Sequence, residues 1–192
     1  MTEPSAGNAL TAALTAELSK KTGVCWLRYA PSTPEQAASA IREGEHAVER
    51  AAWHVWLDGA LCLVSGGDEQ PLPGIEDART VEVIMRSKES GGRLLTWVGE
   101  ASVVRPDDEL WEPVTAALVA SRLNLDDPAS AAAGWAGASV VTRIAPTNAT
   151  VEQPGAISDD GHRAAPMTTE ATTRGALPRI LHRRVKRRPR LS

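Results

Sequence analysis

AAWHVWLDGALCLVSGGDEQPLPGIEDARTVEVIMRSKESGGRLLTWVGEASVV, residues 51–104, decides the fold of this chain. Two apolar runs flank Asp58-Gly59, a dipeptide that favours the positive φ angles of a type I′ turn, so the stretch opens with a predicted β-hairpin. A polar sequence, SKESGG, separates two further apolar runs. The pattern predicts an antiparallel meander that curls into a small barrel, with strands at 50–57, 60–66, 79–86 and 93–105.

The flanking sequence adds two strands and two helices to this meander. GVCWLRYA at 23–30 and ASVVTRIA at 138–145 are apolar runs bounded by glycine or proline, which is typical of strands. Leu10, Leu14 and Leu18 recur at helical spacing and predict a helix over 8–21. A second helix is predicted over 112–123, although Pro113 removes a backbone donor there. The connector at 34–50 is either a short helix or an ordered loop.

The charge of the chain is distributed unevenly along its 192 residues. Residues 174–192 contain eight Lys or Arg and no Asp or Glu, whereas the first 173 residues have a net charge of −11. We therefore predict one domain at 1–147 and a disordered, basic tail at 148–192. The tail is either an extension that solubilises the protein or folds back on the domain or, through residues 174–192, a contact for nucleic acid or an acidic surface. Because it lacks aromatic residues for base stacking, the first interpretation is favoured.

The two cysteines and the apolar runs bear on the cellular compartment. Cys25 and Cys62 both lie in apolar runs, where they form either a disulfide or two buried thiols; buried reduced thiols in a cytoplasmic protein are the favoured interpretation. The sequence MTEPSAGNALTAAL has no basic segment of a signal peptide, and no apolar run has the length of a membrane span. His46 and His54 have no partner at metal-ligand spacing, so no metal site is predicted.

Basic and hydroxyl side chains occur where the predicted strands meet loops. Side chains of these kinds bind phosphate well, and the set consists of Ser65, Arg86, Ser87, Lys88 and Arg93. The alternative is that the charged members are solvated hairpin residues and that Ser65-Gly66-Gly67 is an ordinary turn. Trp56 and Trp97 are predicted to be core residues. No catalytic triad, phosphate-binding glycine loop or general base can be identified.

The order of elements resembles the split β-barrel flavin-binding family, which includes pyridoxamine 5′-phosphate oxidase-like proteins and the deazaflavin-dependent reductases of actinobacteria. The stretches that carry the resemblance are WHVWLDGALCLVSGG (53–67), VEVIMRSK (81–88), RLLTWVGEASVV (93–104) and ASVVTRIAP (138–146). The resemblance implies a mainly β fold with flanking helices, an antiparallel six-stranded split barrel, and a homodimer with the cofactor between subunits. The implied cofactor is FMN or the deazaflavin coenzyme F-420.

The resemblance also implies which residues hold the cofactor. Those are the loop residues Ser65, Gly66 and Gly67 and the turn residues Arg86, Ser87, Lys88 and Arg93. The loop departs from the family pattern because Asp68 and Glu69 stand where positive charge would help, and carboxylates repel a phosphate. Two hypotheses follow: an oxidoreductase in which the flavin supplies the hydride chemistry, and a non-catalytic split-barrel ligand-binding or interaction protein that has lost the cofactor.

Overall fold

The computed structural model describes residues 6–30, 48–87, 92–122, 125 and 127–157, and these contain one antiparallel sheet of seven strands. The strands are β1 (Val24–Tyr29), β2 (Val48–Trp53), β3 (Val55–Leu57), β4 (Ala60–Ser65), β5 (Thr80–Arg86), β6 (Arg93–Val104) and β7 (Val140–Glu152). The β3–β4 hairpin turns at Asp58 and Gly59, which have φ angles of 45° and 74°. These positive values confirm the predicted turn.

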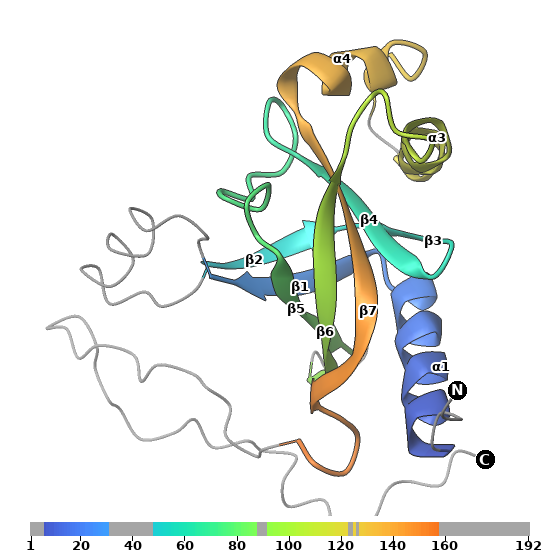
Figure 1. Cartoon of the computed structure of the whole chain (residues 1–192), viewed down its shortest axis with the longest axis vertical. Coiled ribbons are helices and arrows are strands. Elements are labelled where there is room, and N and C mark those ends of the chain that lie inside the picture. Colours follow the sequence, from blue (N-terminus) through green and yellow to red (C-terminus); the bar gives the residue numbers. More distant parts are fainter. Residues whose placement is uncertain (1–5, 31–47, 88–91, 123–124, 126, 158–192) are drawn as a thin grey trace, which may run out of the picture. The chain divides into compact units, whose positions relative to one another are not determined.

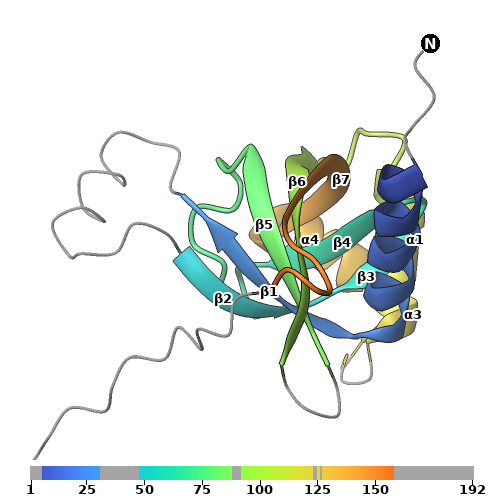
Figure 2. The same ribbon diagram turned by 90° about the horizontal axis from the view of Figure 1, so that it is seen from below.

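The two edge strands of the sheet are neighbours in the sequence. The strand order is β2-β1-β5-β6-β7-β4-β3, so β2 and β3 lie at opposite edges although only His54 separates them. The chain therefore links the two edges. The sheet curls round, as the predicted barrel requires (Figures 1 and 2). The single strand predicted at 50–57 was wrong in one respect. Its first half pairs with β1 and its second half with β4, so it is two strands.

Three helices accompany the sheet in the described residues: α1 (Ala6–Lys21), α3 (Trp111–Ser121) and α4 (Ala131–Ala138). Pro113 lies in the first turn of α3, where backbone N–H groups have no intrahelical partner, so it does not break the helix. The sequence did not predict α4, because AAAGWAGA contains two glycines and little helical periodicity. Figure 1 shows α3 and α4 at one end of β6 and β7, with the start of β6 at the other end.

Two buried clusters hold the described residues together. The larger fills the interior of the curled sheet with side chains such as Leu27, Leu63 and Trp97, and Leu14 and Leu18 of α1 pack against it. The smaller joins β4 and β7 to the two other helices through residues that include Val64, Val141, Leu118 and Trp135. Leu10, the first leucine of the predicted helix, is 73% exposed and belongs to neither cluster.

The last strand extends beyond its predicted end at residue 145. β7 continues through Pro146 to Glu152, which pairs with Thr96 of β6. Pro146 is tolerated because β4 pairs with β7 only as far as Ile144, so β7 has β6 as its single neighbour from there on, across an irregular register. Residues 148–152 of the predicted tail are therefore strand.

Several predictions concern residues outside the described part of the chain. These are Lys88, His46, most of the connector at 34–50 and the basic segment 174–192. In the part that is described, no helix combines the length and the apolar character needed to span a bilayer.

Candidate functional site

The predicted phosphate loop, Ser65-Gly66-Gly67, packs against the junction of α4 and β7. Ser65 is buried, and Gly66 and Gly67 have φ angles of 80° and 61°, which glycine adopts without strain. The Ser139 hydroxyl donates to the Gly66 carbonyl oxygen at 3.1 Å. A Cβ atom on Gly67 would lie 3.0 Å from the carbonyl oxygen of Ala138. The glycines therefore serve a tight turn that contacts the protein's own backbone.

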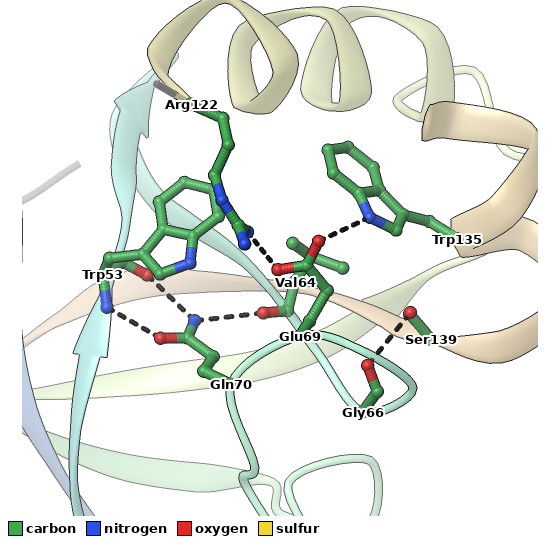
Figure 3. Close-up of polar contacts among 8 residues, drawn as sticks. All are labelled: Trp53, Val64, Gly66, Glu69, Gln70, Arg122, Trp135 and Ser139. Atoms are coloured by element: carbon green, nitrogen blue, oxygen red, sulfur yellow. Dashed lines mark hydrogen bonds and ion pairs between the residues drawn. The ribbon is translucent and has the colours of Figure 1, made fainter. Parts of the chain in front are cut away.

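Glu69, which follows this turn, points into a buried polar network (Figure 3). Its Oε1 accepts a hydrogen bond from Trp135 Nε1 at 3.0 Å, and its Oε2 forms an ion pair with Arg122. Only 7% of the Glu69 side chain is exposed. Because Arg122 offsets this charge, Glu69 does not act as the exposed, repelling carboxylate that the sequence suggested. Asp68, which is exposed, is the remaining acidic group of the loop.

Gln70 ties the same loop to two strands. Its side-chain amide accepts a hydrogen bond from the Trp53 N–H at 2.8 Å and donates to the carbonyl oxygens of Trp53 and Val64, each at 3.0 Å. The Arg122 guanidinium lies 4.9 Å from the centre of the Trp53 ring, a cation–π contact. This network connects the loop to β2, α3 and α4 (Figure 3). Its members are Glu69, Gln70, Arg122, Trp53 and Trp135. These contacts hold the loop in place against β2, α3 and α4.

Of the predicted basic residues, Arg86 ends β5 and Arg93 begins β6. Arg86 and Arg93 are register partners, and the Ser87 N–H donates to the Gly92 carbonyl oxygen at 2.8 Å. Arg93 forms an ion pair with Glu152 of β7, with 3.1 Å between Nη2 and Oε1. Arg93 is therefore partly committed to holding the end of β7.

The two halves of the predicted site lie far apart within one chain. Ser65 pairs with Val140 of β7, and the adjacent residue of β7 pairs with Val104, the last residue of β6. Arg93 is the first residue of the same strand. At about 3.3 Å per residue, the 12 residues of β6 span roughly 35 Å. The chain therefore does not bring Ser65, Gly66 and Gly67 together with Arg86, Ser87 and Arg93.

An aromatic residue that the sequence did not single out lies beside Arg86. Trp26 on β1 is 37% exposed, and the Arg86 guanidinium lies 5.8 Å from its ring centre. Trp26 pairs with Ile84, two residues before Arg86, and strand alternation places all three on the outer face of the sheet. The local signal that could have distinguished Trp26 from a core tryptophan is Arg28, which lies two residues along on the same face of β1 and forms ion pairs there. An exposed ring can stack on a planar ligand, and a cation beside the ring can bind an anionic group of that ligand.

Three titratable side chains in the strands and their connections are buried: His54, Cys25 and Cys62. Burial lowers the pKa of His54, although its Nε2 lies 3.1 Å from the Ser19 carbonyl oxygen. Cys25 and Cys62 are free, buried thiols, and burial raises their pKa values to about 12 and about 11. A thiolate is the reactive form of cysteine, so neither is suited to act as a nucleophile. Among the described residues no cluster of His, Cys, Asp or Glu could hold a metal ion.

Comparison with known proteins gives similarity at the level of structure alone. No protein-family model and no curated protein sequence matches the chain. A crystal structure of HutZ, the heme storage protein from Vibrio cholerae, matches with a TM-score of 0.51 and 16% identity, over 73% of this chain and 92% of that one. The Mycobacterium tuberculosis protein Rv2991 matches with a TM-score of 0.49 and 14% identity, over 76% and 81%.

A further similar structure is a FAD-binding protein from Mesorhizobium loti, with a TM-score of 0.45 and 12% identity over 70% of this chain and 87% of that one. Neighbours of this kind are pyridoxamine 5′-phosphate oxidase-like split-barrel proteins. The resemblance predicted from the sequence is confirmed as a fold: the chain has the split-barrel fold, mainly β with flanking helices. At these identities the similarity defines the fold and nothing finer.

Proposed function

We propose that this protein binds a phosphorylated flavin-type cofactor, FMN or the deazaflavin coenzyme F-420, on the outer face of its sheet beside Trp26 and Arg86. The observation that carries the proposal is the contact between these two side chains, with 5.8 Å between the guanidinium and the ring centre. Trp26 offers a ring face for an aromatic system, and Arg86 offers charge-assisted hydrogen bonds to a phosphate. Ser87 and Arg93, which lie next to Arg86 in the sequence or in register, complete the described part of the proposed phosphate end.

The neutralised Glu69 supports the same proposal. The acidic loop was the main argument against flavin binding. One of its two carboxylates, that of Glu69, is paired with Arg122 and accepts a hydrogen bond from Trp135. The loop also lies at the opposite end of β6 from Arg93, roughly 35 Å away along the strand. At that separation, about four Debye lengths at physiological ionic strength, its charge has little effect on a phosphate beside Arg86.

We propose further that the protein acts as a homodimer through this outer face. Val24 and Trp26 are 54% and 37% exposed and lie two residues apart on one face of β1. Adjacent exposed apolar side chains of this kind mark interaction surfaces. A second copy would cover them and supply the other wall of the cofactor groove. Light scattering of the parent and of Trp26→Ser should give a dimer and a monomer; a parent that is monomeric at micromolar concentration would contradict the proposal.

The chemistry expected of such a protein is redox chemistry that the cofactor supplies, with the chain providing orientation and electrostatics. Binding is tested by absorbance of the purified protein and by titration with FMN and with F-420. Turnover is tested by adding NADPH to the loaded protein and following the cofactor band. Bleaching of the band would support an oxidoreductase. No binding of either cofactor by the parent would contradict the proposal.

The second candidate is a non-catalytic split-barrel protein that binds a ligand passively or serves as an interaction module. The observation in its favour is the Ser65-Gly66-Gly67 turn, whose surroundings are filled by Ser139 and Ala138. A loaded protein whose cofactor band stays constant with NADPH would favour this candidate.

A further inference from the structure

One row of side chains crosses four strands of the sheet and joins the proposed cofactor face to the end of β7. Trp26 of β1 pairs with Ile84 of β5, which in turn pairs with Thr96 of β6. Thr96 pairs with Glu152, the last residue of β7. Residues directly opposite each other in a sheet point to the same face. The neighbours of Trp26 and of Thr96 along their own strands are core residues, so the row lies on the outer face.

Two contacts hold the Glu152 carboxylate on this face. Its Oε2 accepts a hydrogen bond from the Thr96 hydroxyl at 2.9 Å, and its Oε1 lies 3.1 Å from Nη2 of Arg93. Only 16% of the Glu152 side chain and 20% of the Arg93 side chain are exposed. A partly buried ion pair of this kind is screened much less by salt than an exposed one. Arg93 is thus held by an anion that belongs to the protein itself.

The same arginine belongs to the proposed phosphate end. Arg93 is the register partner of Arg86, and the Arg86 guanidinium contacts Trp26. A phosphate bound between the two arginines would come close to the Glu152 carboxylate, and like charges a few ångströms apart repel each other. The phosphate and the carboxylate therefore compete for Arg93.

The contacts of Glu152 also fasten the end of β7 to the start of β6 (Figure 1). From Pro146 onward β6 is the single neighbour of β7 among the described strands, and the register shifts on both sides of Trp97. A strand end with one neighbour and irregular pairing opens at a much lower free energy than the whole domain. Loss of the Arg93–Glu152 pair should therefore release this end and leave the rest of the sheet intact.

We propose that Glu152 is an internal competitor for the phosphate of the cofactor, and that phosphate binding releases the end of β7. This inference rests on the proposed function, because it assigns regulation to the same site. In the empty protein Glu152 occupies Arg93. A phosphorylated ligand takes the place of the carboxylate, and residues 150–152 separate from β6. The competition lowers the affinity for phosphorylated ligands alone, since a ligand without a phosphate does not need Arg93.

The probes are FMN and riboflavin, which share the flavin ring and differ in the phosphate. Each is titrated by flavin fluorescence into the full-length parent, Glu152→Gln and Glu100→Gln. Glu100 is an exposed residue in the second half of β6, so its variant makes the same change in charge away from Arg93. Glu152→Gln should bind FMN at least about threefold more tightly than the parent and riboflavin equally. Glu100→Gln should match the parent with both probes. Circular dichroism checks that both variants are folded.

Release of the strand end has its own readout. In hydrogen exchange followed by mass spectrometry, a peptide covering residues 147–157 should exchange faster when FMN binds the parent and should not change with riboflavin. Equal FMN affinity of the parent and Glu152→Gln, equal tightening of FMN and riboflavin, or slower exchange of this peptide with FMN would each overturn the inference and leave the proposed cofactor site standing. Failure of the parent and of Glu152→Gln to bind FMN would overturn the proposed function and this inference together.

Discussion

Glu69 and Trp135 are 66 positions apart in the sequence, yet Trp135 Nε1 donates to Glu69 Oε1 at 3.0 Å. Arg122 pairs with the other carboxylate oxygen. Through these two contacts, one loop residue connects both α3 and α4 to the end of β4. A carboxylate that the sequence suggested would face a ligand is therefore part of the framework.

Replacing Glu69 should destabilise the fold. In Glu69→Gln the Arg122 guanidinium, whose side chain is 23% exposed, loses its partner. Leaving such a partly buried charge unpaired should reduce the free energy of unfolding by about 1–3 kcal/mol. Chemical denaturation measures the change. Asp68→Asn, an exposed neighbour, is the matched control and should differ from the parent by less than about 0.5 kcal/mol. Equal effects of the two variants would contradict this role of Glu69.

Gly99 should tolerate no side chain. A Cβ atom there would lie 2.4 Å from Cγ2 of Ile144 and 2.8 Å from the Trp97 ring, both of them buried. Gly99→Ala should therefore lower the free energy of unfolding by about 1–3 kcal/mol through overpacking. Gly134 in α4 has no atom within 4 Å of such a position, so Gly134→Ala should raise it by about 0.5–1 kcal/mol. Thermal melts should move in opposite directions; a shared direction would count against the packing argument.

Stability should decline in mild acid because of His54. Burial lowers the pKa of this residue in the folded state, so the folded protein favours the neutral imidazole. The contribution is fully present above the unfolded pKa of about 6.5 and is lost as the pH falls below it towards the folded pKa. Urea midpoints at pH 8, 7, 6 and 5 measure this. In His54→Gln the decline below pH 6.5 should be shallower, and an unchanged decline would refute the assignment to His54.

The end of the folded domain can be located by truncation. Glu152 pairs with Arg93 and accepts a hydrogen bond from Thr96 at 2.9 Å. A chain ending at Thr150 should therefore melt several degrees lower than the parent, whereas a chain ending at Ile157 should melt near the parent temperature. The disordered tail that the sequence predicts from residue 148 onward would instead leave the melting temperature nearly unchanged when the chain ends at Thr150. A large drop for the longer truncation would mean that residues 158–192 contribute to stability.

Local signals in the sequence account for most of the strands. The Asp58-Gly59 turn and the alternating runs around it act over a few residues, and the structure confirms them. The break at His54 could not be predicted, since the residues on either side are equally apolar and differ only in which distant strand they pair with. The contacts of Glu69 also depend on distant parts of the sequence, since its partners Arg122 and Trp135 are 53 and 66 residues away. The candidate site was half predictable: Arg86 was identified from its place at a strand end, but Trp26 was not.

The measurement that tests the account most directly is a titration of FMN, followed by its fluorescence, into the parent, Arg86→Ala and Arg79→Ala. Arg79 is an exposed arginine beside the other end of β5, so its variant makes the same change in charge away from the proposed site. We predict that Arg86→Ala weakens FMN binding at least about tenfold, because a charge-assisted hydrogen bond contributes roughly 1.5–3 kcal/mol. Arg79→Ala should bind like the parent. Equal affinity in all three proteins would place the cofactor elsewhere and contradict the account.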